Sequence, residues 1–315
     1  MPRAMTRQLP PSAVVIAPPQ NGSILSTATP VMDLREECVK MCIYGRNRSG
    51  KTTLAAHFPK PLLFISCEPA HCGGVQSVAN MRDVTLIRVE DKPLAGEHFF
   101  GRKKIEAVGS ELVNTNYYKT VVLKTATSLQ DVILEEMKVE FQGLPLSGRG
   151  SKDTFQMRSS RLHEAMRPLL DLRHMHVVVL AQEKDHNPPV GEGGFPDLKA
   201  KLLRTMQQGS FMAPALGASN AQWLQDACGY VIQIYEDEVM EDIVIPMHNA
   251  DGTPAPPVVQ KVGTGRRQRH LRLQYHPNFA AGGKWQWDRN MPEFVTAPDP
   301  AGLYAAMAAY IPSLK

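Results

Sequence analysis

One short segment of the chain carries the residue types of a phosphate-binding loop. Residues 45–52 read Gly-Arg-Asn-Arg-Ser-Gly-Lys-Thr, which fits the pattern G-x-x-x-x-G-K-[ST] at every position. Glycines let the backbone curl so that successive N–H groups point at an anion, and a helix that starts there adds the positive end of its dipole. In such a loop Lys51 reaches the terminal phosphates and the Thr52 hydroxyl ligates Mg²⁺. The alternative is a glycine-rich turn with a surface lysine.

The motif predicts a nucleotide site with ATP and Mg²⁺ as its ligands. The residues expected to form it are Gly45, Arg46, Asn47, Arg48, Ser49, Gly50, Lys51, Thr52 and Thr53.

Apolar runs around this loop predict the elements that must position it. Residues 41–44 read as a buried strand, and residues 52–58 as a short helix that Pro59 and Pro61 end. Further runs predict strands at 62–65, 84–87, 120–123 and 177–180, with helices between several of them. Strands with continuous apolar runs that alternate with helices are typical of a parallel sheet covered on both faces. The fold class is therefore predicted to be α/β, with ligands at the carboxyl ends of the strands.

The second half of the chain is less regular. Residues 183 to about 220 are rich in Gly and Pro, and a loop of that length is usually functional or disordered. Residues 230–235, 243–245 and 271–273 predict antiparallel strands, and residues 300–311 predict a terminal helix capped by Asp299. Thr127 and Gln130 are expected to form the capping box of an earlier helix.

Composition shifts suggest three segments. Residues 1–35 are rich in Pro, Ser and Thr and predict a flexible arm or an oligomerisation segment. Residues 36–245 predict the nucleotide-binding core. Residues 246–315 predict a C-terminal extension with strands and the terminal helix.

Three of the predicted strands end in polar residues that should meet beside the loop. The second strand is followed by Glu68, the fourth ends at Lys124 and Thr125, and the fifth ends at Gln182. A hydrolytic site needs an acid near Mg²⁺, a group that orients the attacking water and a sensor of the terminal phosphate. Each of these side chains could also be a solvated turn residue or a partner of a neighbouring strand.

These features together resemble the RecA-like P-loop ATPases, and in particular compact phage-encoded relatives linked to single-strand DNA recombination and annealing. The resemblance runs from about Met41 to Tyr235 and rests on the complete loop, the link Leu-Ala-Ala-His-Phe-Pro-Lys-Pro at 54–61, Glu68 and Gln182. It implies that Glu68 polarises the attacking water. It also implies that Gln182 senses the terminal phosphate and begins a DNA-binding loop.

One position departs from the family pattern. The resemblance implies an aspartate at the end of the fourth strand, where this chain has Lys124. An ammonium beside Mg²⁺ is repulsive and cannot accept a hydrogen bond from a metal-bound water. Lys124 could turn outward and leave Thr125 at the site, or contact phosphate and replace part of the metal's charge. Alternatively hydrolysis could be impaired, by nature or by construction. We expect ATP binding with weak turnover.

The most basic run predicts contacts with nucleic-acid phosphates. It contains Arg266, Arg267, Arg269 and Arg272, and its alternative is a solvated strand that pairs with the acidic residues 236–242. The resemblance also implies a homo-oligomer, a ring or a filament, in which Lys199 or Lys201 reaches a neighbour's phosphate. Alternatively, each of these two lysines is an ordinary solvated surface residue. Single-stranded DNA is thus the expected partner.

Composition and net charge limit the class of protein and its expected location. The chain has 315 residues, 35 Lys and Arg against 31 Asp and Glu, a net charge of +4 and five cysteines. This charge is too small to predict nucleic-acid binding by itself, and so few cysteines do not form a disulfide framework. No apolar run approaches the length of a membrane span. We expect a reduced, cytoplasmic protein, in the host cytoplasm if it is encoded by a phage.

A zinc site formed by the cysteines is less well supported than the alternative that they are ordinary buried thiols. Cys67, His71 and Cys72 lie close in sequence, and Cys38 and Cys42 could approach them across the sheet. Two further ligands at zinc spacing are not evident, so a buried thiol is the default expectation.

The sequence leaves a choice of function. The first hypothesis is an ATP-binding RecA-like protein that acts on single-stranded DNA in phage recombination or replication. The second is a nucleotide-gated assembly or adaptor protein in which ATP is a structural ligand. A small-molecule kinase is a third, disfavoured because no arginine-rich lid is recognisable.

Overall fold

The computed structural model describes residues 38–69, 73–90, 100–141, 151–185, 212–216, 218–248, 254–274, 281–283 and 292–314. Several predicted features fall outside these residues. They are the arm at 1–35, His71, Cys72, most of the loop that follows Gln182, Lys199 and Lys201.

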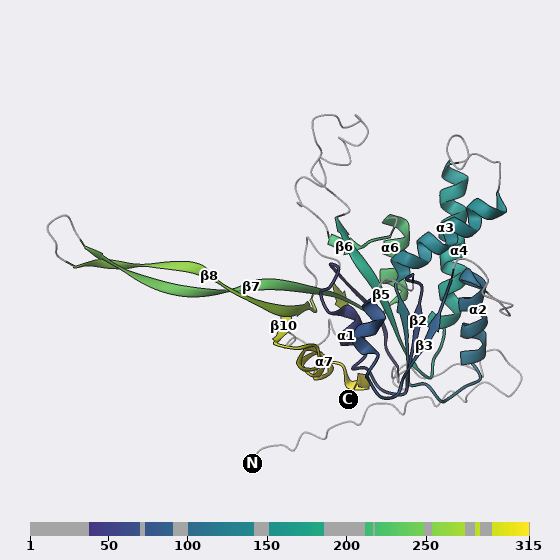
Figure 1. Cartoon of the computed structure of the whole chain (residues 1–315), viewed down its shortest axis with the longest axis horizontal. Helices are drawn as coiled ribbons and strands as arrows, with labels where there is room; N and C mark the ends of the chain where they lie inside the picture. The colour runs from purple at the N-terminus through teal and green to yellow at the C-terminus, as the bar shows by residue number, and fades with distance from the viewer. Residues whose placement is uncertain are drawn as a thin grey trace, which may run out of the picture. The chain divides into compact units, whose positions relative to one another are not determined.

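Ten strands of the described residues form one sheet, in the order β10-β8-β7-β1-β5-β4-β2-β3, with β6 and β9 pairing to β5 and β7. Pairing is parallel from β7 to β3, whereas β8 and β10 are antiparallel (Figure 1). The predicted α/β fold with a mainly parallel sheet is confirmed. The strands are β1 (Lys40–Gly45), β2 (Leu62–Ser66), β3 (Val84–Arg88), β4 (Thr120–Lys124), β5 (His176–Asp185), β6 (Met212–Pro214), β7 (Tyr230–His248), β8 (Pro254–Arg272), β9 (Gly282–Gly283) and β10 (Phe294–Ala297).

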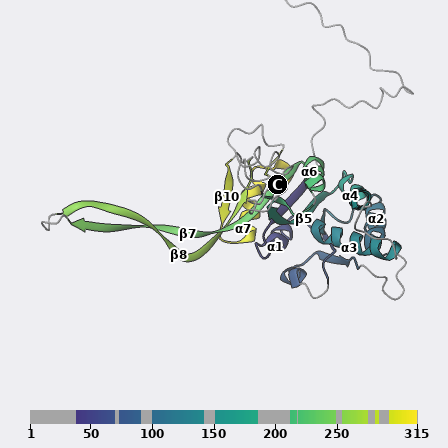
Figure 2. The ribbon, with the colours of Figure 1, turned by 90° about the horizontal axis from the view of Figure 1, so that it is seen from above.

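Alternate residues of the central strands enter two different cores. Tyr44 and Val121 belong to one apolar cluster, while Ile43 and Val122 belong to the other. Helices α2, α3 and α4 cover the first face, and α1 and α7 cover the second (Figures 1 and 2). The helices are α1 (Lys51–Ala55), η3 (Gly73–Val78), α2 (Gly101–Leu112), α3 (Ala126–Glu140), α4 (Ser151–Leu170), α6 (Ala218–Ala227), α7 (Pro300–Ala308) and η5 (Pro312–Leu314). Within the described residues, no helix is long and apolar enough to cross a membrane.

The caps of two helices show what the sequence predicted well and what it did not. Asp299 caps α7 as predicted, since its Oδ1 accepts a hydrogen bond from the Gly302 N–H at 2.8 Å. The capping box at Thr127 and Gln130 is wrong. Helix α3 begins directly after β4, so Thr125 is the N-cap and its hydroxyl accepts from the Ser128 N–H. Thr127 instead lies inside the helix, where its hydroxyl accepts a hydrogen bond from the Gln182 N–H.

Strand β7 has both antiparallel and parallel neighbours. The predicted antiparallel pairing is confirmed with β8 and β9, and residues 230–234 also pair in parallel with β1, which was not predicted. A crossover through α6 returns the chain beside β1, which makes this pairing parallel. Residues 243–245 belong to the same continuous strand, which pairs with β8 along most of its length. The two strands extend together beyond the rest of the sheet as a ribbon (Figure 1). The segment boundary predicted at residue 245 lies within β7 and stays a prediction.

Candidate functional site

The loop between β1 and α1 has the backbone of an anion-binding turn. Gly50 has φ 96°, a left-handed conformation that strongly favours glycine, and Arg48 is also left-handed with φ 66°. Gly45 is required for a different reason, because a Cβ there would collide with the Ile234 carbonyl oxygen of β7. The turn therefore holds its shape through backbone geometry that the two glycines permit.

Lys51 folds back over this loop. Its Nζ donates hydrogen bonds to the carbonyl oxygens of Gly45 at 2.9 Å and Arg46 at 2.7 Å. Burial lowers the pKa of Lys51 to about 8, Glu68 and Glu183 act to raise it, and Lys124 lowers it further. The ammonium is therefore less stable than an exposed one, and an anion in the loop would stabilise its charged form.

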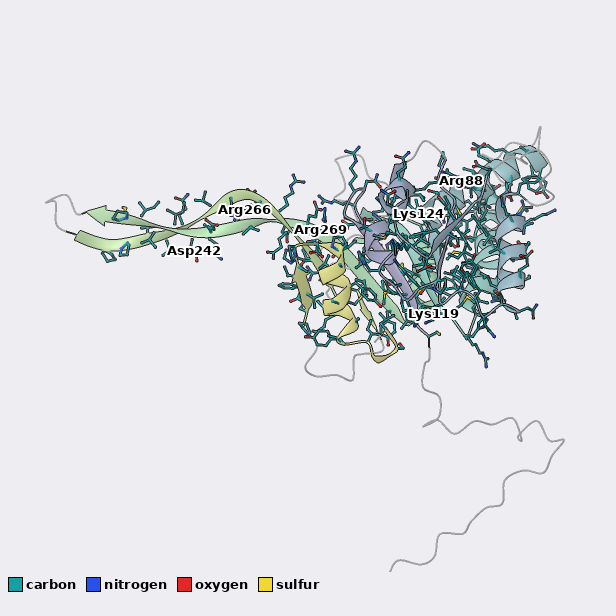
Figure 3. All side chains as sticks on the ribbon, turned by 60° about the horizontal axis from the view of Figure 1, so that its bottom comes forward. Arg88, Lys119, Lys124, Asp242, Arg266 and Arg269 are labelled. Carbon is teal, nitrogen blue, oxygen red and sulfur yellow. The ribbon has the colours of Figure 1, made fainter. Side chains whose placement is uncertain are left out.

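Lys124 is the last residue of β4 (Figure 3). Its side chain is 3% exposed, and its Nζ lies 2.9 Å from Oε2 of Glu68, whose side chain is 17% exposed. Strands β2 and β4 pair so that Ser66 is opposite Lys124, which brings Glu68, two residues later, next to the ammonium. Gly74 of η3 packs against Lys124, because a Cβ at that position would collide with Nζ. The lysine does not turn outward.

Thr125 is engaged elsewhere. Its hydroxyl caps α3 and lies 2.9 Å from the Ser128 hydroxyl. The structure therefore contradicts the alternative in which Lys124 turns outward and Thr125 takes its place at the site.

Gln182 and Glu183 lie in β5 where its pairing with β1 stops, beside the loop. Gln182 pairs in register with Gly45, the first residue of the loop. Glu183 accepts a hydrogen bond from the Gln233 side chain at 3.1 Å and lies 3.7 Å from Nε of Arg46. Sequence reasoning missed Glu183; the available signal was its position directly after Gln182 at a strand end.

The basic run of β8 divides into two groups. Arg269 forms an ion pair with Glu236 at 2.7 Å, and its Nε lies 3.5 Å from where a Cβ on Gly50 would be. Arg272 donates to Gln233 and forms an ion pair with Glu293. Arg266 and Arg267 are exposed on the ribbon, and no ion pair of either is found within the described residues (Figure 3). The strand thus places Arg269 against the phosphate loop, which its sequence did not indicate.

The residues at this site do not fit a tightly held Mg²⁺. Thr52 offers a hydroxyl, but the position expected to carry an acid holds Lys124, and Glu68 is paired with that lysine. Among the described residues no group of three or more His, Cys, Asp or Glu side chains could hold a metal. A divalent cation here would meet the ammonium groups of Lys51 and Lys124, and the nearby Glu68 carboxylate is already paired with Lys124.

Three buried polar atoms near the loop lack hydrogen-bond partners within the described part of the chain. They are Oγ of Ser49, Oγ of Ser66 and Nζ of Lys124, whose approach to Glu68 is close but not aligned as a hydrogen bond. Buried polar groups are almost always satisfied in native proteins, and exceptions call for an explanation such as a ligand. Ser66 and Lys124 end neighbouring strands and Ser49 lies in the phosphate loop, so an anion bound in the loop would have donors nearby.

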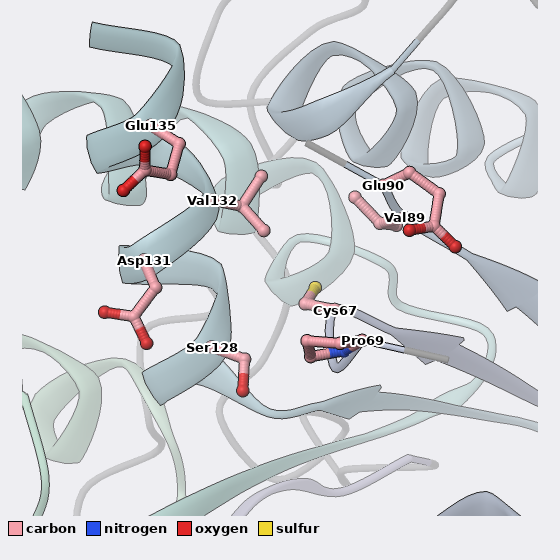
Figure 4. A pocket seen from close by; sticks show the side chains of 8 residues that line it. All are labelled: Cys67, Pro69, Val89, Glu90, Ser128, Asp131, Val132 and Glu135. Carbon is pink, nitrogen blue, oxygen red and sulfur yellow. The ribbon is translucent and has the colours of Figure 1, made fainter. Parts of the chain in front are cut away.

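A separate pocket of about 340 Å³ lies between the ends of β2 and β3 and helix α3 (Figure 4). Its carboxylates would repel phosphate, and burial raises the pKa of Asp131, one of them. The pocket is therefore unsuited to a triphosphate. Its lining residues are Cys67, Pro69, Val89, Glu90, Ser128, Asp131, Val132 and Glu135.

Cys38, Cys42, Cys67 and Cys228 form no disulfide. Burial raises the pKa of Cys42 and of Cys67, as for inert buried thiols. The other residues of the zinc alternative, His71 and Cys72, lie outside the described residues.

Comparison with known proteins agrees with this geometry. A family model described as an AAA domain matches residues 37–285, which is most of the chain and includes the phosphate loop, Glu68, Lys124 and Gln182. A search of curated proteins finds no match. The matched family supports nucleotide binding, as do the parallel sheet and the loop at its edge. The chain therefore belongs to the AAA-domain family of P-loop ATPases.

Proposed function

We propose that the protein binds ATP at the loop of residues 45–53 and hydrolyses it weakly. The observation that carries this proposal is the buried pair of Lys124 and Glu68 beside an intact phosphate loop. Loop geometry, Lys51 and the unsatisfied serine hydroxyls support binding. In the RecA-like resemblance Glu68 polarises the attacking water, and a carboxylate held by an ammonium is a weaker base.

We propose further that the ATP-bound protein acts on single-stranded DNA, in phage recombination or replication. Exposed Arg266 and Arg267 on the ribbon support a contact with phosphates, and the phage setting rests on the resemblance. Assembly into a ring or filament, with Lys199 or Lys201 reaching a neighbour's nucleotide, belongs to the same proposal, as does a cytoplasmic location.

A second function is favoured by the same ion pair. If Lys124 abolishes turnover, ATP is a structural ligand that gates assembly, and the protein is an adaptor rather than a motor or recombinase. In that case ATP changes the oligomeric state while DNA has no effect.

The test is the steady-state ATPase rate of the full chain with and without single-stranded DNA, alongside calorimetric ATP binding. Binding with slow, DNA-stimulated turnover supports the first function. Tight binding with no turnover and no DNA effect supports the second. Absence of any binding, with Lys51→Ala behaving like the unmodified chain, contradicts both.

A further inference from the structure

Lys124 lies at the position where the family pattern has an acid beside Mg²⁺. We propose that the protein binds a nucleoside triphosphate in its metal-free form, with the Lys124 ammonium supplying positive charge where a P-loop protein ordinarily holds a divalent cation. The inference rests on the nucleotide binding proposed above and concerns the form of the nucleotide that the loop accepts.

The first support is the fixed position of the ammonium. Lys124 is buried, its Nζ points to the carboxyl end of the sheet, and Gly74 closes over it. A lysine ammonium has three N–H donors, and Glu68 is its one ion-pair partner within the described residues, in poor alignment for a hydrogen bond. Donors are therefore left for phosphate oxygens, which are strong acceptors.

The second support is the balance of charge near the loop. Lys124 lowers the pKa of Lys51, while Glu68 and Glu183 act more strongly to raise it. Glu68 is already paired with Lys124, so a divalent cation would meet two ammonium groups and one carboxylate that is engaged. Metal-free ATP carries about two more negative charges than its magnesium complex and would therefore gain more from the two ammonium groups.

The competing explanation gives Lys124 a smaller role. In it the lysine only neutralises Glu68, and Mg²⁺ binds through Thr52 and the phosphates. That explanation requires tighter binding in the presence of Mg²⁺, whereas ours requires binding that survives its removal.

The experiment measures ATP affinity by calorimetry on the full chain, in excess MgCl₂ and in excess EDTA. For the unmodified chain we expect ATP to bind more tightly in EDTA than in MgCl₂, because excess Mg²⁺ depletes the metal-free nucleotide. For Lys124→Asp we expect ATP to bind at least about tenfold more tightly with Mg²⁺ than with EDTA. Lys124→Met retains a long side chain without the charge and should weaken binding in EDTA by about tenfold or more. Lys119→Met is the matched control, because it removes an exposed lysine that immediately precedes the opposite end of the same strand.

The outcomes separate the two proposals. Binding in MgCl₂ that disappears in EDTA leaves the proposed function standing and overturns this inference. Absence of binding in both conditions overturns the proposed function itself. Equal loss of affinity in Lys124→Met and Lys119→Met would also overturn the inference, and circular dichroism of each variant establishes that it is folded.

Discussion

At the scale of single residues, the ion pair of Lys124 and Glu68 decides how the site behaves. Neither residue type is unusual, and the sequence indicated both as strand-end residues beside the loop. Their contact could not be predicted from spacing, because it depends on β2 and β4 being neighbours in the sheet. Gly74 was missed because it reaches Lys124 from η3, far from that strand in sequence, whereas Glu183 directly follows Gln182 and could have been named with it.

Replacing Lys124 by aspartate should raise ATP turnover. The substitution removes the ammonium, releases Glu68 from its ion pair and restores an acceptor for a metal-bound water. We expect at least about a tenfold higher rate in MgCl₂, which corresponds to about 1.4 kcal/mol of barrier. The measurement is steady-state phosphate release.

The same variant places two carboxylates side by side in a buried site. Its melting temperature should therefore be lower than that of the unmodified chain in EDTA and should recover when MgCl₂ and ATP are added. An unchanged turnover rate in a folded Lys124→Asp protein would contradict the assignment of residue 124 to the hydrolytic site.

Affinity for ATP should depend on pH through Lys51. Burial lowers the pKa of Lys51 to about 8 in the free protein, and a bound triphosphate raises it again by stabilising the ammonium. Binding above pH 8 therefore takes up a proton, so the association constant should fall by up to about tenfold per pH unit as pH rises through this range. Calorimetry between neutral pH and pH above 9 measures the slope.

Lys51→Arg provides the control for this titration, because a guanidinium stays protonated throughout the range. Its affinity should be lower overall but nearly flat with pH. A slope equal to that of the unmodified chain would assign the pH dependence to another group.

Arg269 should contribute to nucleotide affinity and not to DNA binding. Its Nε lies against Gly50 of the phosphate loop, while its partner Glu236 keeps it in place. Arg269→Ala is expected to weaken ATP binding by about tenfold or more, because a hydrogen bond to a charged group contributes about 1.5–3 kcal/mol. Arg267→Ala removes the same charge farther out on the ribbon and should leave ATP affinity unchanged. An equal loss of ATP affinity in the two variants would show that the overall positive charge of the protein, and not a contact of Arg269, affects binding.

At the scale of elements, the sheet was predictable and the ribbon was not. Strands β1, β2 and β4 are buried along almost their whole length because both faces of the parallel sheet are covered there, and that apolar pattern is visible in sequence. Beyond Tyr235, β7 and β8 mix aliphatic and charged residues on both faces, so the pattern suggested only a short strand at 243–245. An isolated ribbon buries little on either face, which leaves no periodic signal to read.

The terminal helix offers a prediction about stability. Asp299 accepts the Gly302 N–H at the start of α7, and this helix packs Tyr304 against Phe58 of the phosphate-loop face. Asp299→Ala should reduce the free energy of unfolding by about 1 kcal/mol, the usual value of an N-cap. Urea denaturation measures the change, and Asp299→Asn, which keeps a capping oxygen, should lose less than half as much. Equal losses would indicate a role for the charge instead of the cap.

At the scale of the whole molecule, the arginines of β8 fall into two groups, one beside the core and one farther out on the ribbon. Arg269 and Arg272 are held near the core by acidic partners, whereas Arg266 and Arg267 lie exposed farther out. The nucleotide and the proposed DNA contact therefore involve different residues of one strand, and β7, which pairs with both β1 and β8, connects them.

The double substitution Arg266→Ala and Arg267→Ala tests the DNA contact. Each cation that meets a phosphate of single-stranded DNA releases counterions, with a slope of about −0.7 in log K against log salt concentration. If both arginines bind phosphates, the slope should become shallower by about 1.4 and the affinity at low salt should fall, while ATP affinity stays constant. Fluorescence anisotropy of a labelled oligonucleotide over a range of salt concentrations measures both quantities.

The matched control, Lys103→Ala with Lys138→Ala, removes two exposed cations from α2 and α3. Because general electrostatic attraction depends on net charge, an equal change in both double variants would assign DNA binding to the overall field of the protein, and only a selective loss in the ribbon variant assigns it to this surface.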